Sequence, residues 1–342
     1  MGINISIIVP IYNTPQIYFR NCLESLHKQN LEDLEFILIN DGSTEPWIDK
    51  IASEFCSMDN RFKYLIKKNT GAADTRNYGI EVCRGDYIMF VDSDDTLSED
   101  ACKYAFNSIK ASNSDVVILG IGFYPKEQTL IKKMLSKDEH IKLKYSTLAF
   151  TSLYKEFDLL IDSPCAKIFK SSIIKSNNIK FPVQLKRSED AMFCLYYYEC
   201  CEKIFLDNLI IYTYVYNPDS TCHKCSDVSV KALPKVLEEE ELFLNNNQNN
   251  KILYSNALPE RTIKGIQESF STYFLNRNNN KSENVLIKEL KEFLNIPIVH
   301  KYFIKSDFSK IKGKRKKLYW ILLRLRLYKQ VFICERILKH LA

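Results

Sequence analysis

The sequence lacks any uncharged apolar run of about 18 residues, the length expected of a helix that crosses a bilayer. It also lacks the features of a secretory signal. Residues 2–12 begin directly with a strand-like apolar segment and have neither a basic leading region nor a small-residue cleavage site. The chain is therefore expected to be cytoplasmic, with no membrane-spanning segment.

The cysteines show no regular framework, although the chain contains 11 of them. Irregular spacing of this kind is typical of free thiols in a reducing cytosol. Cys222 and Cys225 form one C-x-x-C pair, but a zinc site of that type needs a second pair, and none is evident. No G-x-G-x-x-G segment follows the first apolar strand, so a nicotinamide-dependent dehydrogenase is also disfavoured. No internal repeat stands out.

The composition is that of a globular protein long enough for two domains. The 342 residues are 46% hydrophobic and 26% charged, which is enough apolar material for a substantial core. The net charge of +6 is unevenly spread, because residues 310–317 alone carry six positive charges. This distribution favours a local anionic partner over a nucleic acid bound along the whole chain.

The first third of the chain alternates between strand and helix patterns. Strands are predicted at residues 5–9, 34–39, 62–66, 87–91 and 116–119. Helices are predicted at residues 18–28, 47–55, 72–83 and 101–112. This alternation is typical of βαβ units on a mainly parallel sheet flanked by helices, an α/β fold. Residues 123–190 are less regular.

Polar clusters follow four of these strands, at the point where each strand ends. Tyr12 and Asn13 follow the first strand, Asp41 the second, residues 69–71 the third and residues 92–95 the fourth. In parallel sheets ligands bind beyond the carboxyl ends of the strands, so these clusters are expected to converge. The last cluster, Asp-Ser-Asp-Asp, has the oxygen ligands that suit Mg²⁺ or Mn²⁺. An ordinary acidic turn is the alternative explanation.

These segments, taken in order, resemble the family 2 glycosyltransferases, which have the GT-A fold. The resemblance rests on SIIVPIYN at 6–13, NDGSTE at 40–45, NTGAADTRNYGI at 69–80, GDYIMFVDSDD at 85–95 and RSEDAMF at 187–193. It covers about the first 220 residues. It implies an inverting, metal-dependent enzyme that moves a sugar from a nucleoside diphosphate, with UDP favoured, to a glycan or lipid-linked acceptor. Bacterial surface polysaccharide synthesis is the implied setting.

The resemblance also implies roles for individual residues in binding the donor nucleotide. Asp41 would hydrogen-bond the uracil, although an Asx-turn before Gly42 would also explain it. Asp92 would face the ribose, and Asp94, with Asp92, would bind the Mn²⁺ or Mg²⁺ ion that bridges the two phosphates. Asp95 would support the metal site or the donor sugar. The remaining donor-binding residues implied are Pro10, Tyr12, Asn13, Gly71 and Arg76.

The catalytic base is implied at Glu189-Asp190, with Asp190 favoured over Glu189. Transfer needs a carboxylate within hydrogen-bond reach of the acceptor hydroxyl. An acidic pair is also common at the start of a helix, where it complements the helix dipole. The nearby segment 162–167 contains a lysine, a feature that the family often shows near the acceptor. His223 is a weak candidate for a phosphate contact.

The C-terminal part, residues 226–342, is predicted to be a mostly helical region that follows a catalytic domain at 1–225. In its basic tail, apolar residues recur at helical spacing, and Tyr319 and Trp320 are predicted to reach a lipid headgroup layer. The tail is therefore expected to touch an anionic membrane surface, or else to pack on the catalytic domain.

Two other functions compete with glycosyl transfer. A sugar-phosphate nucleotidyltransferase is expected to have a Gly-rich, basic loop after its first strand, and PIYNTPQ at 10–16 is neither. A non-catalytic nucleotide-sugar-binding or scaffold module would not need the acidic residues 92, 94 and 190.

Overall fold

The structure is a computed structural model that describes residues 2–122, 130–151, 153–154, 157–216, 225–247, 254–307, 309, 311 and 313–340. It divides into two compact units. Unit 1 comprises residues 1–147, 151–183 and 189–217, and unit 2 comprises residues 148–150, 184–188 and 218–342. Residues 217–224, which include His223 and Cys222, lie outside the described residues. The ten described cysteines are all free thiols, as expected.

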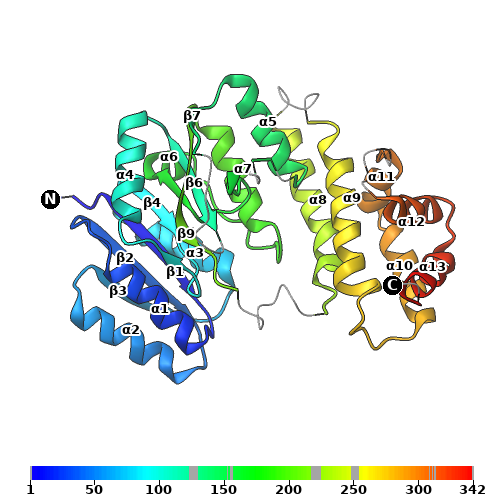
Figure 1. Cartoon of the computed structure of the whole chain (residues 1–342), viewed down its shortest axis with the longest axis horizontal. Helices are drawn as coiled ribbons and strands as arrows, with labels where there is room; N and C mark the ends of the chain where they lie inside the picture. The colour runs from blue at the N-terminus through cyan, green and yellow to red at the C-terminus, as the bar shows by residue number, and fades with distance from the viewer. Residues whose placement is uncertain are drawn as a thin grey trace. The chain divides into compact units, whose positions relative to one another are not determined.

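Unit 1 contains one nine-stranded sheet in the order β3-β2-β1-β4-β8-β6-β9-β5, with β7 paired to β9 (Figure 1). Its strands are β1 (Ile5–Ile11), β2 (Leu34–Asp41), β3 (Phe62–Lys67), β4 (Tyr87–Phe90), β5 (Thr96–Leu97), β6 (Val116–Gly122), β7 (Lys132–Met134), β8 (Lys167–Lys170) and β9 (Ile204–Thr213). Strands β3, β2, β1 and β4 are parallel neighbours, and β6 is parallel to β9. Strand β8 is antiparallel to β4 and β6, so the predicted mainly parallel α/β sheet is present.

The helices of unit 1 cover both faces of this sheet. They are α1 (Gln16–His27), α2 (Pro46–Met58), α3 (Ala72–Val82), α4 (Ala101–Ser112), α5 (Lys137–Leu148), α6 (Ser171–Ser176) and α7 (Glu189–Cys200). Alternate residues of β1 point to opposite faces, as strand geometry requires. Ile7 packs in a core with residues of α1, α2 and α4, whereas Ile8 packs in a second core with residues of α3 and α7.

The strands and helices predicted over residues 5–119 are all present, with ends that differ by three residues or fewer. The middle segment is more regular than the sequence indicates. It contains β7, α5, β8, α6 and the start of α7 between residues 132 and 190. Short strands and a polar helix carry a weak periodic signal, which explains why this part of the fold was not predicted.

A buried carboxylate fixes the strand ends opposite to the polar clusters. Glu35, which is 1% exposed, accepts hydrogen bonds from Ser6 Oγ at 2.6 Å, from the Arg84 backbone N–H at 2.6 Å and from Lys63 Nζ at 2.5 Å. Burial alone opposes ionisation, but these donors hold the pKa of Glu35 at about 2. The charged form therefore ties β1, β2 and β3 to the start of β4.

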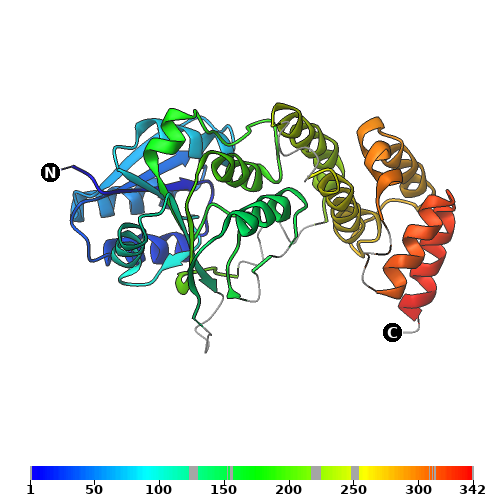
Figure 2. The ribbon, with the colours of Figure 1, turned by 90° about the horizontal axis from the view of Figure 1, so that it is seen from above.

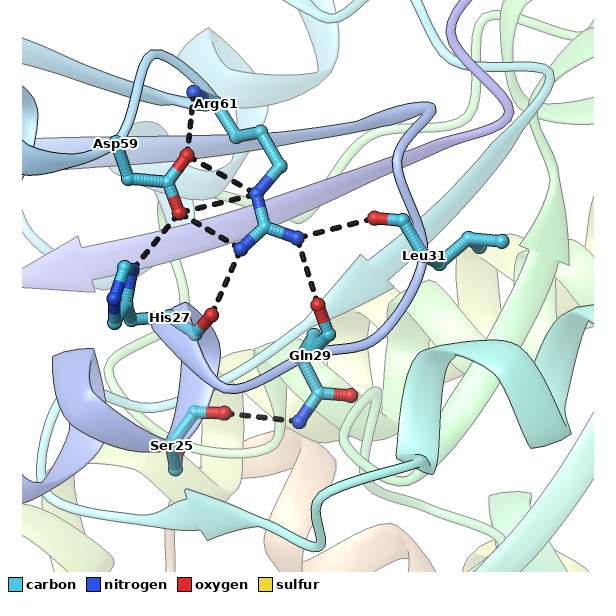
Figure 3. Close-up of polar contacts among 6 residues, drawn as sticks. All are labelled: Ser25, His27, Gln29, Leu31, Asp59 and Arg61. Carbon is cyan, nitrogen blue, oxygen red and sulfur yellow. Dashed lines mark hydrogen bonds and ion pairs between the residues drawn. The ribbon is translucent and has the colours of Figure 1, made fainter.

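A second network holds the end of α1 against the loop before β3 (Figure 3). Arg61 pairs with Asp59 at 2.7 Å and donates to the backbone carbonyls of His27, Gln29 and Leu31. The Gln29 side chain donates to the carbonyl of Ser25, an acceptor on α1 itself. The network satisfies carbonyls at the C-terminal end of α1, which would otherwise have no partner in the helix.

Unit 2 is mostly helical, as the sequence predicts for its longest segment. Its helices are α8 (Val228–Asn246), α9 (Ala257–Ser269), the π-helix η4 (Phe270–Phe274), α10 (Glu283–Leu294), α11 (Pro297–Lys305), α12 (Lys314–Arg324) and α13 (Tyr328–His340). Helices α8 and α9 lie side by side (Figures 1 and 2). Between them Arg261 pairs with Glu240 at 3.3 Å, and both side chains are buried. Burial raises the pKa of Glu240 to about 8.

The basic tail differs from its prediction in one respect. Tyr319 and Trp320 are 6% and 2% exposed, so the proposal that they reach a lipid headgroup layer is wrong. They lie on the inner face of α12, where Trp320 packs edge-on against Phe303. Burying these large rings removes a large apolar area from water. No described helix is long and apolar enough to cross a bilayer.

Candidate active site

The predicted polar clusters lie at one edge of the sheet, because β1, β2, β3 and β4 run in the same direction. Pro10 lies near the end of β1, paired with Ile39 of β2. On the other side of β1, the pairing with β4 stops at Ile8 and Phe90. Pro10 has no N–H to continue that ladder, so β1 and β4 stop pairing where the polar residues begin.

The loops after β1 and β2 are joined by side-chain amides. Asn13, with φ of 48°, accepts a hydrogen bond from the Thr44 backbone N–H at 2.8 Å. Asn40 accepts one from the Ser43 N–H, three residues on, at 2.8 Å, so its side chain holds the turn after β2. Tyr12, beside Asn13, is 54% exposed. The exposed ring of Tyr12 and a loop held by the hydrogen bonds of Asn13 therefore lie at the end of β1.

Asp41 is buried and bonds to the loop after β3. One of its oxygens accepts from Lys67 Nζ at 2.8 Å and from the Thr70 N–H at 3.0 Å, and the other accepts from the Gly71 N–H at 2.8 Å. A carboxylate has about four acceptor sites, so little capacity remains for a further partner. The contacts to Thr70 and Gly71 differ from the predicted Asx-turn before Gly42. A contact between Asp41 and uracil stays a prediction.

Glycine is required twice where these loops meet. Gly42 has φ of +70°, and a Cβ there would lie 2.8 Å from the backbone nitrogen of Asn69. Gly71 has φ of +100° and immediately precedes α3. Both conformations are rare for residues with a side chain. The two glycines let the loops after β2 and β3 approach each other and leave the first turn of α3 open to the sheet edge.

Asp74, an acidic residue in the first turn of α3, is paired with a cation. Lys67, at the end of β3, lies 3.0 Å from the Asp74 carboxylate and also contacts Asp41. The hydrogen bond from Thr70 and the contact with Lys67 lower the pKa of Asp74. The negative charge of Asp74 is thus offset locally. Lys67 was not singled out from the sequence, because a lysine at a strand end is too common to carry a signal.

Arg76 connects the two acidic motifs that the sequence places more than 90 residues apart. Its Nη2 donates to Asp92 at 2.8 Å and its Nη1 donates to Asp190 at 2.9 Å. The Arg76 side chain is 6% exposed, whereas those of Asp92 and Asp190 are 37% and 33% exposed. The buried guanidinium of Arg76 therefore fixes the positions of two partly exposed carboxylates, Asp92 and Asp190, relative to each other. A direct contact between Arg76 and a diphosphate stays a prediction.

Asp190 has the properties of a base that works near neutral pH. Burial raises its pKa to about 7, opposed by Arg76 and reinforced by the negative charges of Glu189 and Asp92. A general base is most effective when its pKa is close to the working pH. Glu189, the preceding residue, is half-buried at the first position of α7. Of the two candidates, Asp190 is the one bonded to Arg76, and its role as the base stays a prediction.

The remaining acidic residues of the Asp-Ser-Asp-Asp cluster have different surroundings. Asp95 is 2% exposed, and it accepts hydrogen bonds from Tyr212 Oη at 2.6 Å and from the Val215 N–H at 2.8 Å. Burial raises the pKa of Asp95 to about 7. Tyr212 Oη also accepts the Asp92 N–H at 3.1 Å, so Asp95 supports the turn that carries Asp92. Asp94 is half-buried.

The residues at this edge suit a divalent cation that a ligand helps to hold. Within the described ranges, no three His, Cys, Asp or Glu side chains are grouped closely enough to bind a metal ion. Asp92 and Asp94 offer oxygen atoms, and one oxygen of Asp92 is already bonded to Arg76. Mg²⁺ is often bound by one or two carboxylates together with substrate phosphates and water. The donor set fits a cation of that kind.

Comparison with known proteins agrees with the sequence resemblance. A sequence model of the family described as Glycosyl transferase family 2 matches residues 6–176, half of the chain. EpsH of Bacillus subtilis is 34% identical over 197 residues, which cover 55% of this chain and 54% of that protein. An uncharacterized glycosyltransferase of Haemophilus influenzae is 31% identical over 178 residues, covering 52% of this chain and 69% of that protein.

A further relative is TarP of Staphylococcus aureus, a poly(ribitol-phosphate) beta-N-acetylglucosaminyltransferase. It is 30% identical over 199 residues, 56% of each chain. The chain spans about half the length, or less, of the first curated relatives that it matches. Sequence identity in these comparisons therefore covers only part of each relative.

Among solved structures, residues 1–349 of Staphylococcus aureus TarS in complex with UDP-GlcNAc superpose with a TM-score of 0.65 at 21% identity. They cover 98% of this chain and 92% of that one. The complex of the same fragment with UDP gives 0.63 at 20% identity, with 99% and 92% covered. The predicted GT-A fold with a helical C-terminal region is confirmed.

Proposed function

The chain belongs to the family 2 glycosyltransferases, and we propose that it transfers a sugar from a UDP donor to a hydroxyl of a glycan or lipid-linked acceptor in bacterial surface polysaccharide synthesis. The observation that supports this most strongly is Arg76, whose guanidinium joins Asp92 to Asp190. Arg76 thereby brings the proposed donor-binding carboxylate of Asp92 and the proposed base, Asp190, to one edge of the sheet. An enzyme that activates a hydroxyl next to a nucleotide diphosphate needs both groups.

In the proposed reaction Asp190 accepts the proton of the acceptor hydroxyl. The oxygen then attacks the anomeric carbon from the face opposite the diphosphate, so a single displacement inverts the configuration. The surroundings that raise the pKa of Asp190 to about 7 make it a stronger base than an ordinary aspartate. Arg76 acts as a positioning residue, because it fixes the Asp190 carboxylate relative to the donor side of the site.

The donor nucleotide is proposed to lie over the loops after β1, β2 and β3. The exposed ring of Tyr12 would stack on the base, beside Pro10 and Asn13. Asp41 would contact the uracil through its remaining acceptor capacity. Gly71, before the first turn of α3, would let phosphate oxygens approach the free N–H groups of that turn.

Mn²⁺ or Mg²⁺ is proposed to bind at Asp92 and Asp94, and it would neutralise charge on the departing UDP. The protein residues would orient that ion rather than enclose it, because each carboxylate is at least partly accessible. Asp95 would contribute by holding the turn in place through Tyr212. This support role explains why a third aspartate follows the D-x-D pair without reaching solvent.

The acceptor and the cellular location are proposed from the relatives and from α12. TarP acts on poly(ribitol phosphate), so a hydroxyl-rich, phosphate-linked polymer is the first acceptor to test. Lys314, Lys317, Leu318, Ile321 and Leu325 share the outer face of α12, and its three apolar residues are 42%, 43% and 63% exposed. A basic and apolar face of this kind suits peripheral contact with anionic lipid on the cytoplasmic side.

The proposed function is tested with the full chain and a panel of nucleotide sugars that includes UDP-GlcNAc and UDP-glucose. We expect at least one to be turned over in the presence of Mn²⁺, measured as UDP release, with loss of turnover in Asp190→Asn. That variant should still bind the donor, because the substitution preserves shape. Absence of metal-dependent turnover or thermal stabilisation by every donor would refute the proposal, and full turnover by Asp190→Asn would refute the assignment of the base.

A further inference from the structure

A cavity of about 500 Å³ lies between helices α8, α9 and α11 of unit 2, which pack against one another (Figure 1). That volume is within the range of small-ligand sites in proteins. All the residues that line the cavity belong to unit 2, so it is distinct from the site at the sheet edge. Its lining includes Leu244 of α8 and Leu258 of α9, which are both buried. An apolar wall of this kind suits the C–H groups of a sugar or polyol.

Two lysines of α11 line the same cavity, four residues apart in the chain. The ammonium groups of Lys301 and Lys305 lie 5.1 Å and 6.0 Å from the centroid of the Tyr302 ring. Lysines at this spacing share a helix face and repel each other. Glu241 of α8 offsets one of the two charges, because its carboxylate accepts hydrogen bonds from Lys301 Nζ and, at 2.7 Å, from Tyr302 Oη. Among the residues that the structure describes, no carboxylate forms an ion pair with Lys305.

The lining therefore combines one excess positive charge with neutral hydrogen-bonding groups. Asn245 brings an amide and Ser255 a hydroxyl, and both residues are exposed at the mouth of the cavity. An ammonium group binds phosphate as a point charge, and amides and hydroxyls exchange hydrogen bonds with the hydroxyls of a ligand. Lys305 also lies in the last turn of α11, where a cation is favourable without any ligand. The experiment must separate these two explanations.

We propose that this cavity binds a polyol or sugar that carries a phosphate, namely one repeat of the acceptor polymer. The inference rests on the proposed function, which gives a hydroxyl-rich, phosphate-linked polymer as the acceptor. The phosphate pairs with Lys305, and the hydroxyls bond to Asn245 and Ser255. Because a polymer presents the same unit many times, a repeat held in unit 2 raises the local concentration of the other repeats at the enzyme.

Binding is measured by calorimetry on the full chain with ribitol phosphate, ribitol and inorganic phosphate, in the absence of a donor. We expect ribitol phosphate to bind, and each of the other two to bind at least about tenfold more weakly. Lys305→Gln alters an exposed side chain and should weaken the binding of ribitol phosphate by about tenfold, since one charge-assisted contact is lost. Lys291→Gln is the matched control, because Lys291 is an exposed lysine in the last turn of α10. It should leave this binding unchanged.

Three results of the calorimetry would overturn the inference. The first is that ribitol phosphate does not bind, or binds Lys305→Gln as tightly as the native chain. The second is equal affinity for inorganic phosphate, which would show an anion site that does not recognise the polyol. The third is an equal loss of affinity in Lys291→Gln, which would assign the effect to the charge of a helix end rather than to the cavity.

Turnover distinguishes the acceptor polymer from a free polyol phosphate. With the donor that the panel identifies, the KM for poly(ribitol phosphate) should rise several-fold in Lys305→Gln, while kcat and the affinity for UDP stay unchanged. An unchanged KM beside binding that depends on Lys305 would assign the cavity to a free polyol phosphate and overturn its role in acceptor binding.

The two proposals fail in distinguishable ways. Absence of turnover with every donor would refute the proposed function, and the calorimetry would still decide whether the cavity binds a polyol phosphate. If the native chain is active and Lys305→Gln matches it in both binding and KM, the proposed function stands and only the site in unit 2 is overturned.

Discussion

Replacing Arg76 probes both the stability of the site and the chemistry of its base. Arg76→Met keeps the length and apolar volume of the side chain and removes the guanidinium. Arg76→Lys keeps the charge but cannot reproduce a planar fork that bonds Asp92 and Asp190 at once. The two variants therefore separate the effect of the charge from the effect of the geometry.

The stability loss can be bounded from the two hydrogen bonds. A hydrogen bond to a charged group contributes about 1.5–3 kcal/mol, and the two carboxylates are 37% and 33% exposed, so solvent screens part of this. We expect Arg76→Met to lower the free energy of unfolding by about 2–4 kcal/mol and Arg76→Lys by about 1–2 kcal/mol. Denaturant unfolding of unit 1 would report both values.

Removing the guanidinium of Arg76 should also shift the pH profile of kcat/KM. As the proposed base, Asp190 must be ionised to accept a proton, so kcat/KM is expected to rise with pH and to level off above the Asp190 pKa of about 7. Arg76 lowers that pKa, and its removal leaves Asp92 and Asp190 without their shared cation. The acid limb in Arg76→Met should move up by about one pH unit or more, whereas in Arg76→Lys it should move by less.

The assay compares donor turnover between about pH 5.5 and 9 with the unfolding curves of the same preparations. Arg20→Met is the matched control, because Arg20 pairs with Glu54 in a bidentate contact on the surface of unit 1. That control should change the stability little and leave the pH profile unchanged, because solvent screens an exposed ion pair. An acid limb that stays in place in Arg76→Met would refute the claim that this guanidinium sets the charge state of the base.

Three further variants test separate parts of the molecule. Asp94→Ala should weaken binding of UDP in the presence of Mn²⁺ by tenfold or more in calorimetry, and leave metal-free binding nearly unchanged. Leu318→Glu combined with Ile321→Glu should reduce flotation of the full chain with vesicles rich in phosphatidylserine, because the outer face of α12 loses its apolar residues. Glu35→Gln should destabilise the protein at neutral pH by about 3 kcal/mol, since the native pKa of Glu35 is about 2 against 4.5 when unfolded.

Each of these three has a control or a contradicting result. Equal affinity for UDP with Mn²⁺ in Asp94→Ala would remove that residue from the metal site. Vesicles of neutral lipid serve as the control for flotation, and unchanged flotation of the α12 variant would end the membrane proposal. The low pKa of Glu35 fixes the direction of the pH effect on the free energy of unfolding. Its contribution to stability is fully present above pH 4.5 and is lost as the pH falls toward 2. Glu35→Gln should make the free energy of unfolding depend less on pH in this range. An unchanged slope would refute the role given to Glu35.

The sequence predicts the fold and the site best in the first part of the chain, where strand and helix patterns occur together with an ordered set of motifs. Apolar runs such as residues 34–39 predict strands, and each polar cluster beyond a strand was placed correctly at one edge, because parallel strands end together. Asp190 and Asp92 were chosen separately from the resemblance. Their shared contact with Arg76 could not be derived, since nothing in local spacing relates α3 to α7 across more than 100 residues.

The remaining features depend on tertiary packing. The burial of Trp320 follows from which face of α12 has a partner, and helical spacing alone does not decide this. Apolar residues at 318, 321 and 325 have the spacing of an inner face, yet they are exposed, while 319, 320 and 323 are buried. Lys67 and Tyr212 were missed for a different reason. Both act through side-chain contacts with aspartates, and neither belongs to a recognisable motif.

The balance of charge at the sheet edge explains why donor and cation would bind together. Asp92 and Asp190 share the guanidinium of Arg76 there, and a UDP-sugar would add further negative charge on its diphosphate. Without a cation the phosphates would meet a site of their own sign. The described acidic side chains do not enclose a metal by themselves, so in the proposed complex the diphosphate would supply part of the coordination. Donor and Mn²⁺ should therefore raise each other's affinity by the same factor, a reciprocity that titration of either ligand at fixed levels of the other can measure.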